Sequence, residues 1–204
     1  MPSSRGAPRT KRRLFGIDRS GPRPPQTRRG APLRPFTIPN LVGYVRLAAI
    51  PVFLALALDS GDGRYAPATL LFIAIAAGDY VDGFLARATG QYSRMGALLD
   101  PVVDRATVLS GVVVCWHFEL LPRWALAALA ARELITLVLA QVSLRRGIEI
   151  EINWIGRIGV FGIFGTIGLS LMLAWGVIEA VFVLSVAISI AATTVYIRVG
   201  LGRS

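Results

Sequence analysis

Apolar residues form six long runs along the 204-residue chain, at roughly residues 41–58, 66–86, 96–117, 122–144, 154–175 and 177–197. Each run is close to the ~20 residues that an α-helix needs to cross the hydrocarbon core of a bilayer. The connections at 59–65 and 118–121 are short, which makes the helices that they join antiparallel neighbours. Too little polar sequence remains to cover six such helices in water. We therefore predict an all-α integral membrane protein with six transmembrane helices.

Four aspartates lie where the second run ends and the third begins. Asp79 and Asp82 are three residues apart, and Asp100 and Asp104 are four apart, so on a helix each pair shares one face. If the two helices pack antiparallel, the four carboxylates converge, and they cannot all stay ionised without a cation. Clusters of oxygen ligands suit Mg²⁺, Mn²⁺ or Ca²⁺ rather than zinc or copper. The spacing predicts a polar metal cavity at one end of the helices.

Composition supports the membrane assignment, and charge divides the chain. Hydrophobic residues make up 54% of the sequence, with a mean hydropathy of +0.59, whereas soluble domains are nearer 45–50% apolar.

Residues 1–35 hold ten of the 22 Lys and Arg, one acid and seven prolines. We predict a basic, Pro-rich, disordered tail at 1–35 and one membrane domain at 36–204. The tail either attracts anionic lipid headgroups or only sets the topology. Nucleic acid is not an expected partner, because no aromatic residues alternate with the basic ones.

Basic residues in the loops predict the orientation in the membrane. With the tail inside, the cytoplasmic side receives the ten basic tail residues and seven further arginines, and the outer side receives only Arg64 and Arg123. We predict a multi-pass protein of the cytoplasmic membrane with both termini in the cytoplasm. The cavity with the aspartates then faces the cytoplasm.

The stretch from Asp79 to Asp104 reads D-x2-D-G-x2-A-R-x8-G-x3-D-x3-D without a gap. This pattern resembles the signature of the CDP-alcohol phosphotransferases (CDP-alcohol phosphatidyltransferases), membrane enzymes of phospholipid synthesis. The resemblance implies that an alcohol attacks the β-phosphorus of a lipid-linked CDP donor and that CMP leaves. It also implies that the cavity holds a nucleotide together with Mg²⁺ or Mn²⁺, as two ions.

Roles for individual residues follow from the resemblance by motif position. Asp79, Asp82 and Asp100 would bind metal, and Asp104 would be a ligand of the second ion and the general base. Arg87 would lie near the nucleotide phosphates. The full set expected to contact CDP is Asp79, Asp82, Gly83, Ala86, Arg87 and Gly96.

The acceptor alcohol is less constrained than the donor. T-I-P-N before the first run, L-L-D-P-V-V-D and A-R-E-L-I look most like the bacterial phosphatidylglycerophosphate synthases of this family, which implies CDP-diacylglycerol as donor and glycerol 3-phosphate as acceptor. Arg105 stands where that branch is expected to have Lys. The region after Arg146 looks closer to the family's cardiolipin synthases, whose acceptor is phosphatidylglycerol.

Three arginines outside the motif are candidates for holding the phosphate of the acceptor, because arginine suits bidentate phosphate recognition. They are Arg46, Arg132 and Arg157. For Arg132, pairing with the neighbouring Glu133 is the alternative.

Two further interpretations remain open. Glycines recur at every third position of the fifth run, and such a face permits either packing within the bundle or a homodimer interface; the glycines are Gly156, Gly159, Gly162, Gly165 and Gly168. A function of another class, a divalent-cation transporter, would also fit four aspartates in membrane helices. Binding of CMP or CDP would distinguish the two functions, because a transporter has no reason to bind either.

Overall fold

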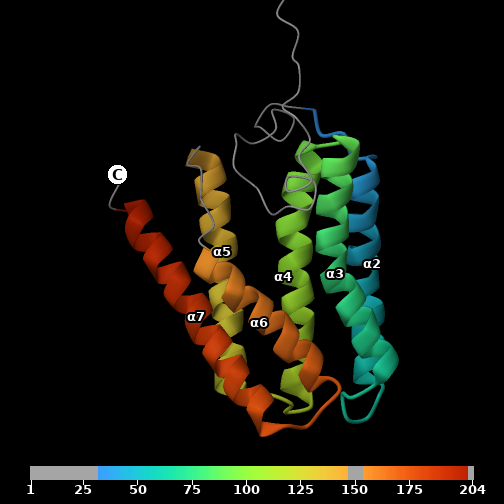
Figure 1. The fold of residues 1–204 in the computed structure, drawn as a ribbon, viewed down its shortest axis with the longest axis vertical. Coiled ribbons are helices and arrows are strands. Elements are labelled where there is room, and N and C mark those ends of the chain that lie inside the picture. Colours follow the sequence, from blue (N-terminus) through green and yellow to red (C-terminus); the bar gives the residue numbers. More distant parts are fainter. Residues whose placement is uncertain (1–31, 147–153, 202–204) are drawn as a thin grey trace, which may run out of the picture. The chain divides into compact units, whose positions relative to one another are not determined.

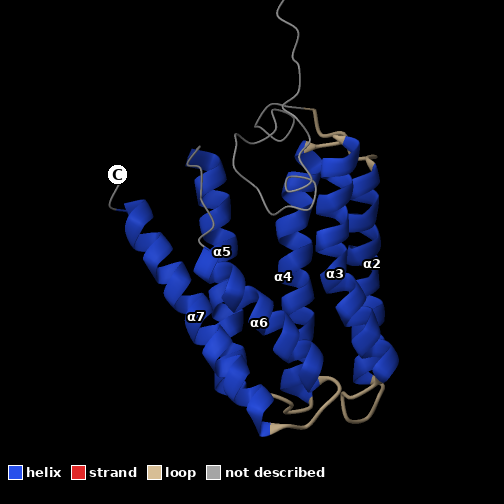
Figure 2. Ribbon diagram, viewed as in Figure 1, coloured by secondary structure: helices blue, strands red, loops and turns tan. Residues whose placement is uncertain are grey.

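The computed structural model describes residues 32–146 and 154–201, and every regular element in these ranges is an α-helix (Figures 1 and 2). One helix corresponds to each predicted apolar run, which confirms the all-helical prediction for this part of the chain. The fifth helix ends at Ser170, earlier than predicted. The helices are α2 Ile38–Leu58, α3 Ala66–Thr89, α4 Arg94–His117, α5 Arg123–Arg146, α6 Trp154–Ser170 and α7 Gly176–Leu201. The disordered tail predicted at 1–35 lies mostly outside the described residues.

Local sequence signals explain several helix ends. The Thr37 hydroxyl accepts a bond from the Asn40 amide at 3.4 Å, and the Ser93 hydroxyl accepts one from the Gly96 amide at 2.9 Å. These are the side-chain caps expected at the first turn of a helix, here α2 and α4. Gly90, with φ +69°, directly follows the last residue of α3. Glycine is favoured at this position because it adopts the left-handed conformation without strain.

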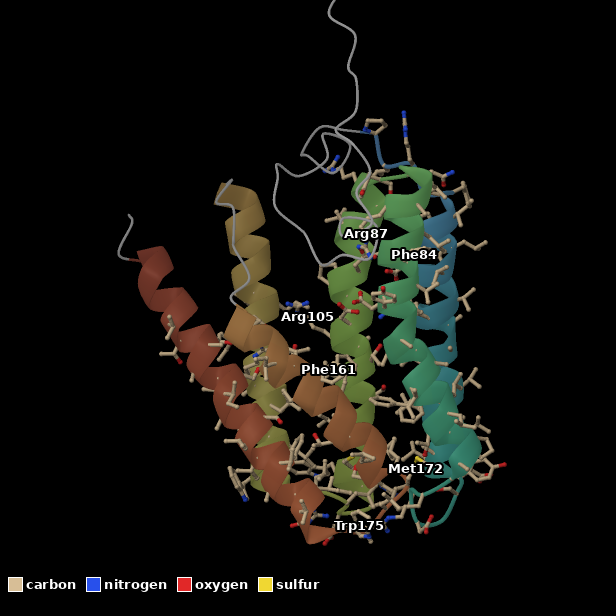
Figure 3. All side chains as sticks on the ribbon, in the orientation of Figure 1. Phe84, Arg87, Arg105, Phe161, Met172 and Trp175 are labelled. Atoms are coloured by element: carbon tan, nitrogen blue, oxygen red, sulfur yellow. The ribbon has the colours of Figure 1, made fainter. Side chains whose placement is uncertain are left out.

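Three described helices are long and apolar enough to cross a membrane: Ile38–Leu58, Ala66–Thr89 and Gly176–Val195. The apolar part of α6, Ile158–Ser170, is shorter. The apolar sequence of α4 is interrupted by Asp100, Asp104 and Arg105. Large apolar side chains are exposed, among them Phe161 of α6 at 81% and Trp175, in the connection before α7, at 65% (Figure 3). Such surfaces fit contact with lipid, whereas six complete spans remain a prediction.

The described chain divides into two compact units. The first contains residues 32–48 and 77–103, that is, the beginning of α2, the end of α3 and the beginning of α4. The second contains residues 49–76, 104–146 and 154–201. Its apolar core includes Phe53 and Phe72, whose ring centroids are 5.2 Å apart, and the fully buried Phe182.

Within the second unit, α7 packs against α5 and α6 (Figure 1). The glycines of α6 allow this close approach. A Cβ added at Gly159 would lie 3.0 Å from the Ser189 nitrogen, and one at Gly162 would lie 2.3 Å from the Ser185 hydroxyl oxygen. These two glycines therefore serve packing within the chain, which was the first of the two interpretations of the glycine face.

Candidate functional site

A cavity of about 290 Å³ opens in the first unit, at the small end of the range for ligand pockets, about 300–1,000 Å³. Helix α3 supplies five of its six lining residues, and Asp100 of α4 supplies the sixth; the lining is Asp79, Tyr80, Asp82, Gly83, Arg87 and Asp100. All of these residues except Tyr80 were candidate site residues from the sequence. Asp79, Asp82 and Asp100 thus border one cavity, whereas the helical spacing predicted that Asp104 would converge with them as a fourth carboxylate.

The first two aspartates of the motif have different surroundings. The Asp79 side chain is 54% exposed, whereas that of Asp82 is 6% exposed. Arg46 of α2 donates from Nη1 to the Asp82 carboxylate at 2.8 Å, and the same nitrogen lies 3.7 Å from the Asp79 carboxylate. Arg46, one of the three arginines predicted to hold the acceptor, therefore contacts two motif aspartates in this structure.

Arg87, labelled in Figure 3, follows Gly83 by one turn of α3. A Cβ added at Gly83 would lie 3.1 Å from Nη1 of Arg87. The guanidinium therefore folds back along the helix over the glycine, toward the start of the D-x2-D-G sequence. This position places a positive charge on the cavity wall, where an anionic group would be bound. Ala86 precedes Arg87 on α3 and is not one of the lining residues.

Gly96, predicted to contact CDP, lies next to Asn40 instead of lining the cavity. A Cβ at Gly96 would be 2.7 Å from Oδ1 of Asn40 and 3.3 Å from the Ser93 hydroxyl oxygen. The Ser93 hydroxyl donates to Asn40 Oδ1 at 3.0 Å, and Asn40 Nδ2 donates to the carbonyl oxygens of Arg34 and Pro35 at 3.1 and 3.0 Å. Asn40 is only 3% exposed. It joins the segment before α2 to the start of α4, the helix that carries Asp100.

Asp104 follows Asp100 by one turn of α4 and belongs to the second unit. Among the described residues, no three His, Cys, Asp or Glu side chains converge closely enough to hold a metal ion. The donor chemistry nevertheless fits a hard cation, because three carboxylates line one cavity. Arg46 supplies positive charge to two of these carboxylates.

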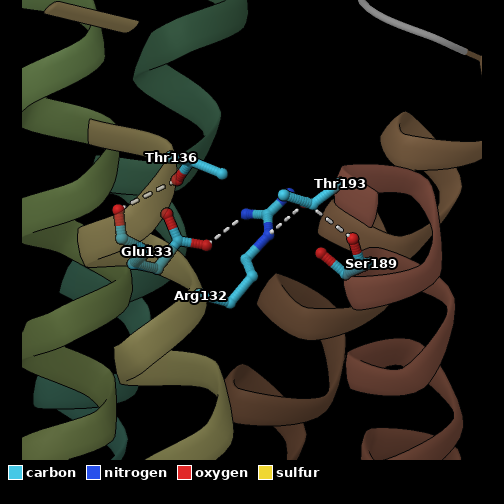
Figure 4. Close-up of polar contacts among 5 residues, drawn as sticks. All are labelled: Arg132, Glu133, Thr136, Ser189 and Thr193. Carbon is cyan, nitrogen blue, oxygen red and sulfur yellow. Dashed lines mark hydrogen bonds and ion pairs between the residues drawn. The ribbon is translucent and has the colours of Figure 1, made fainter. Parts of the chain in front are cut away.

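The other two predicted acceptor residues belong to the second unit. Arg132 donates from Nη1 to the Glu133 carboxylate and from Nε to the Thr193 hydroxyl at 3.2 Å, which links α5 to α7 (Figure 4). Both side chains of the ion pair are largely buried, at 14% and 7% exposure. Pairing with Glu133 was the alternative considered for Arg132. The Arg157 side chain lies outside what the structure describes, although its backbone is part of α6.

Comparison with known proteins identifies the family. Residues 36–195 match the CDP-alcohol phosphatidyltransferase family. The chain is 38% identical to the cardiolipin synthase (CMP-forming) of Streptomyces coelicolor over 134 residues, which cover 64% of this chain and 62% of that protein. It is 32% identical to a probable phosphatidylglycerophosphate synthase of Mycobacterium tuberculosis over 160 residues, 76% of each chain. It is 29% identical to the CDP-diacylglycerol–glycerol-3-phosphate 3-phosphatidyltransferase of Bacillus subtilis over 135 residues, 60% of this chain and 70% of that protein.

The match with the Streptomyces cardiolipin synthase thus covers about three fifths of that relative's length. The family match includes the whole D-x2-D-G-x2-A-R-x8-G-x3-D-x3-D stretch and all the residues that border the cavity. On this match, which covers more than half of the sequence, the chain belongs to the CDP-alcohol phosphatidyltransferase family.

Proposed function

We propose that the chain transfers the phosphatidyl group from CDP-diacylglycerol to a hydroxyl acceptor and releases CMP. The observation that carries this proposal is the cavity bordered by Asp79, Asp82, Asp100 and Arg87, all positions of the family motif. A divalent-cation transporter would use the aspartates but would have no use for an arginine on the same wall. The cavity would then lie at the cytoplasmic side of a six-span membrane protein, where a water-soluble nucleotide can leave.

In this proposal the acidic residues of the cavity bind metal and the basic residue binds phosphate. Asp79, Asp82 and Asp100 would hold Mg²⁺ or Mn²⁺, and Asp104, one turn further along α4, would complete the metal site and accept the proton of the attacking hydroxyl. When bound, the metal would neutralise the diphosphate of the donor. Arg87, positioned over Gly83, would hold a phosphate of CDP by a charge-assisted hydrogen bond. The role of Gly83 would be to leave room for the Arg87 guanidinium beside the helix.

For the acceptor, we favour phosphatidylglycerol, which would make the chain a cardiolipin synthase. Glycerol 3-phosphate is a dianionic monoester that several arginines would have to bind, and two of the three candidates, Arg46 and Arg132, already bond to carboxylates. Phosphatidylglycerol is a phosphodiester with one negative charge, so fewer arginines are needed to bind it. The 38% identity to the Streptomyces enzyme points the same way.

Glycerol 3-phosphate, the acceptor first expected from the sequence, remains the second candidate. It is supported by the relative from Mycobacterium tuberculosis, which is similar to this chain over the greatest length of the three relatives compared, 160 residues. With this acceptor, Arg157 and Arg132 would share the phosphate monoester, and the Arg132–Glu133 pair would have to rearrange.

One experiment tests both levels of the proposal. The purified protein, in mixed micelles with CDP-diacylglycerol and Mn²⁺ or Mg²⁺, is given phosphatidylglycerol, glycerol 3-phosphate, inositol phosphate or serine, and CMP release is measured. We expect release with phosphatidylglycerol to exceed that with each other acceptor. Faster CMP release with glycerol 3-phosphate would mean that the chain is a phosphatidylglycerophosphate synthase. No CMP release with any acceptor would refute the proposed activity.

A further inference from the structure

Arg46 holds a permanent positive charge against two aspartates of the proposed metal site. Its side chain is 4% exposed, and Nη1 lies 2.8 Å from the Asp82 carboxylate and 3.7 Å from the Asp79 carboxylate. The residue is outside the family motif and comes from α2, 36 positions before Asp82. Its position needs an explanation, because a charge among apolar helices is costly and usually functional.

Helix α3 is shaped to receive this arginine. A Cβ added at Gly78 would lie 2.6 Å from Cδ, 2.9 Å from Cγ and 3.1 Å from Nε of Arg46. A side chain at position 78 would therefore force Arg46 to shift from this position. The glycine immediately before the motif keeps open the space that Arg46 fills, so the Arg46–Asp82 pair is supported by the packing as well as by charge.

We propose that Arg46 is a built-in counter-cation of the aspartate motif. It neutralises the buried Asp82 while no metal is bound, and it opposes the binding of a divalent ion by electrostatic repulsion. The inference rests on the proposed function, because it takes Asp79 and Asp82 to be metal ligands. It gives Arg46 a role different from holding the acceptor phosphate, the role expected from the sequence.

The two roles of the counter-cation are thermodynamically linked. Without the guanidinium, Asp82 is a buried carboxylate with less compensation, so the metal-free protein loses stability. The metal-bound protein loses less, because the ion supplies the missing charge. Whatever destabilises only the metal-free state strengthens metal binding. Removal of the positive charge should therefore tighten metal binding and lower the metal-free melting temperature together.

The test measures Mn²⁺ binding to the full-length protein in detergent, from the loss of the electron paramagnetic resonance signal of free Mn²⁺. Arg46→Gln removes the charge but retains an amide that can hydrogen-bond to Asp82, and Arg46→Lys retains the charge. We expect Arg46→Gln to bind Mn²⁺ about tenfold more tightly than wild type or better, since a like charge within ~4–6 Å shifts such equilibria by one or more log units. Arg46→Lys should stay within about threefold of wild type, because the repulsion is retained.

Arg132→Gln is the matched control, because it also breaks a largely buried arginine–carboxylate pair, the one with Glu133 in the second unit. It should lower the melting temperature without changing the Mn²⁺ affinity. Arg46→Gln should also melt lower than wild type without metal and should gain more from added Mn²⁺ than wild type does.

Each other outcome has a definite meaning. Unchanged Mn²⁺ affinity in Arg46→Gln overturns the proposal. Weaker affinity also overturns it and would make Arg46 a residue that orients Asp82 as a ligand, a loss typically of about 10–100-fold. An Arg46→Gln protein that stays unfolded even with Mn²⁺ contradicts the proposal, because the ion should replace the missing charge. If wild type itself binds no Mn²⁺, the metal-dependent function fails and the role of Arg46 fails with it.

Discussion

Replacement of Asn40 by alanine tests whether the start of α4 is held in place by the segment before α2. The change removes two hydrogen bonds from Nδ2, to the carbonyls of Arg34 and Pro35, and the bond that Oδ1 accepts from the Ser93 hydroxyl. The Pro35 carbonyl oxygen still accepts a hydrogen bond from the Tyr44 hydroxyl at 3.3 Å. The Ser93 hydroxyl still caps the Gly96 amide.

The magnitude follows from these three bonds. A net hydrogen bond contributes about 0.5–1.5 kcal/mol, and a buried group left without a partner costs more. Because Asn40 is 3% exposed and the Arg34 carbonyl loses the Asn40 donor, we expect Asn40→Ala to lower the free energy of unfolding by about 2–4 kcal/mol. Asn40→Asp keeps an oxygen for Ser93 but turns an acceptor toward the two carbonyls, so it should destabilise at least as much.

Denaturation by SDS in mixed micelles measures these differences, with CMP release measured alongside. Gln91→Ala is the matched control, because it removes an exposed bond between the same two regions, 3.1 Å from the Ile38 amide, and should cost less than about 0.5 kcal/mol. Asn40→Ala should also lower kcat, since α4 carries Asp100. A loss of stability below about 0.5 kcal/mol in Asn40→Ala would refute the reasoning.

Three further predictions concern the metal ligands, the tail and the α6–α7 contact. Asparagine at any cavity aspartate should nearly abolish CMP release while the protein still inserts and folds, and full turnover in excess chelator would contradict the metal site; the positions are Asp79, Asp82 and Asp100. Deletion of residues 1–30 removes nine Lys and Arg; CMP release in mixed micelles should persist, and retention on anionic vesicles at low salt should weaken. Gly162→Leu should cost about 1–3 kcal/mol of stability through the clash with Ser185, whereas Gly165→Leu, with open space at its Cβ, should be near neutral.

Local patterns in the sequence were sufficient to predict the helices and the presence of Asp79, Asp82 and Asp100 at one cavity, although not the position of Asp104 outside its lining. A run of about twenty apolar residues identifies a helix without knowledge of its neighbours. The D-x2-D spacing fixes one face of α3, and the short connection from Thr89 to Arg94 brings the start of α4 beside it. The grouping of Asp79, Asp82 and Asp100 around one cavity follows from these local facts.

Contacts between distant residues were not predictable in the same way. The Arg46–Asp82 pair joins residues 36 positions apart, and the Asn40–Ser93 bond joins residues 53 apart. Both depend on which faces of neighbouring helices meet, and the low amphipathicity of membrane helices leaves that undecided. Gly78 is a signal that could have suggested a close contact with α3 at this point, because a glycine inside an apolar helix often marks a close approach.

Gly96 shows why the contacts of a motif residue could not be predicted from its spacing alone. A glycine at a fixed spacing from Asp100 indicates that something lies close to the backbone, but the spacing does not say whether a ligand or a side chain fills the space. In the structure the space belongs to Asn40 and Ser93.

Charge balance in the first unit connects these observations to the proposed chemistry. The cavity is bordered by three carboxylates, Asp79, Asp82 and Asp100, and positive charge comes from Arg87 on its wall and from Arg46 beside two of the aspartates. Three acids and two arginines leave one negative charge, which is tolerable at a partly open site but not for a buried cluster. One divalent ion would turn this into one positive charge, or into neutrality when Asp104 is counted, and a second ion would add two positive charges. The site would then attract a diphosphate and would hold it less tightly once it is cleaved to a monophosphate. With the proposed function, the arginines would allow a metal-free protein to remain folded and a metal-bound one to select an anionic donor, which is the behaviour that phosphatidyl transfer from a CDP-linked lipid requires.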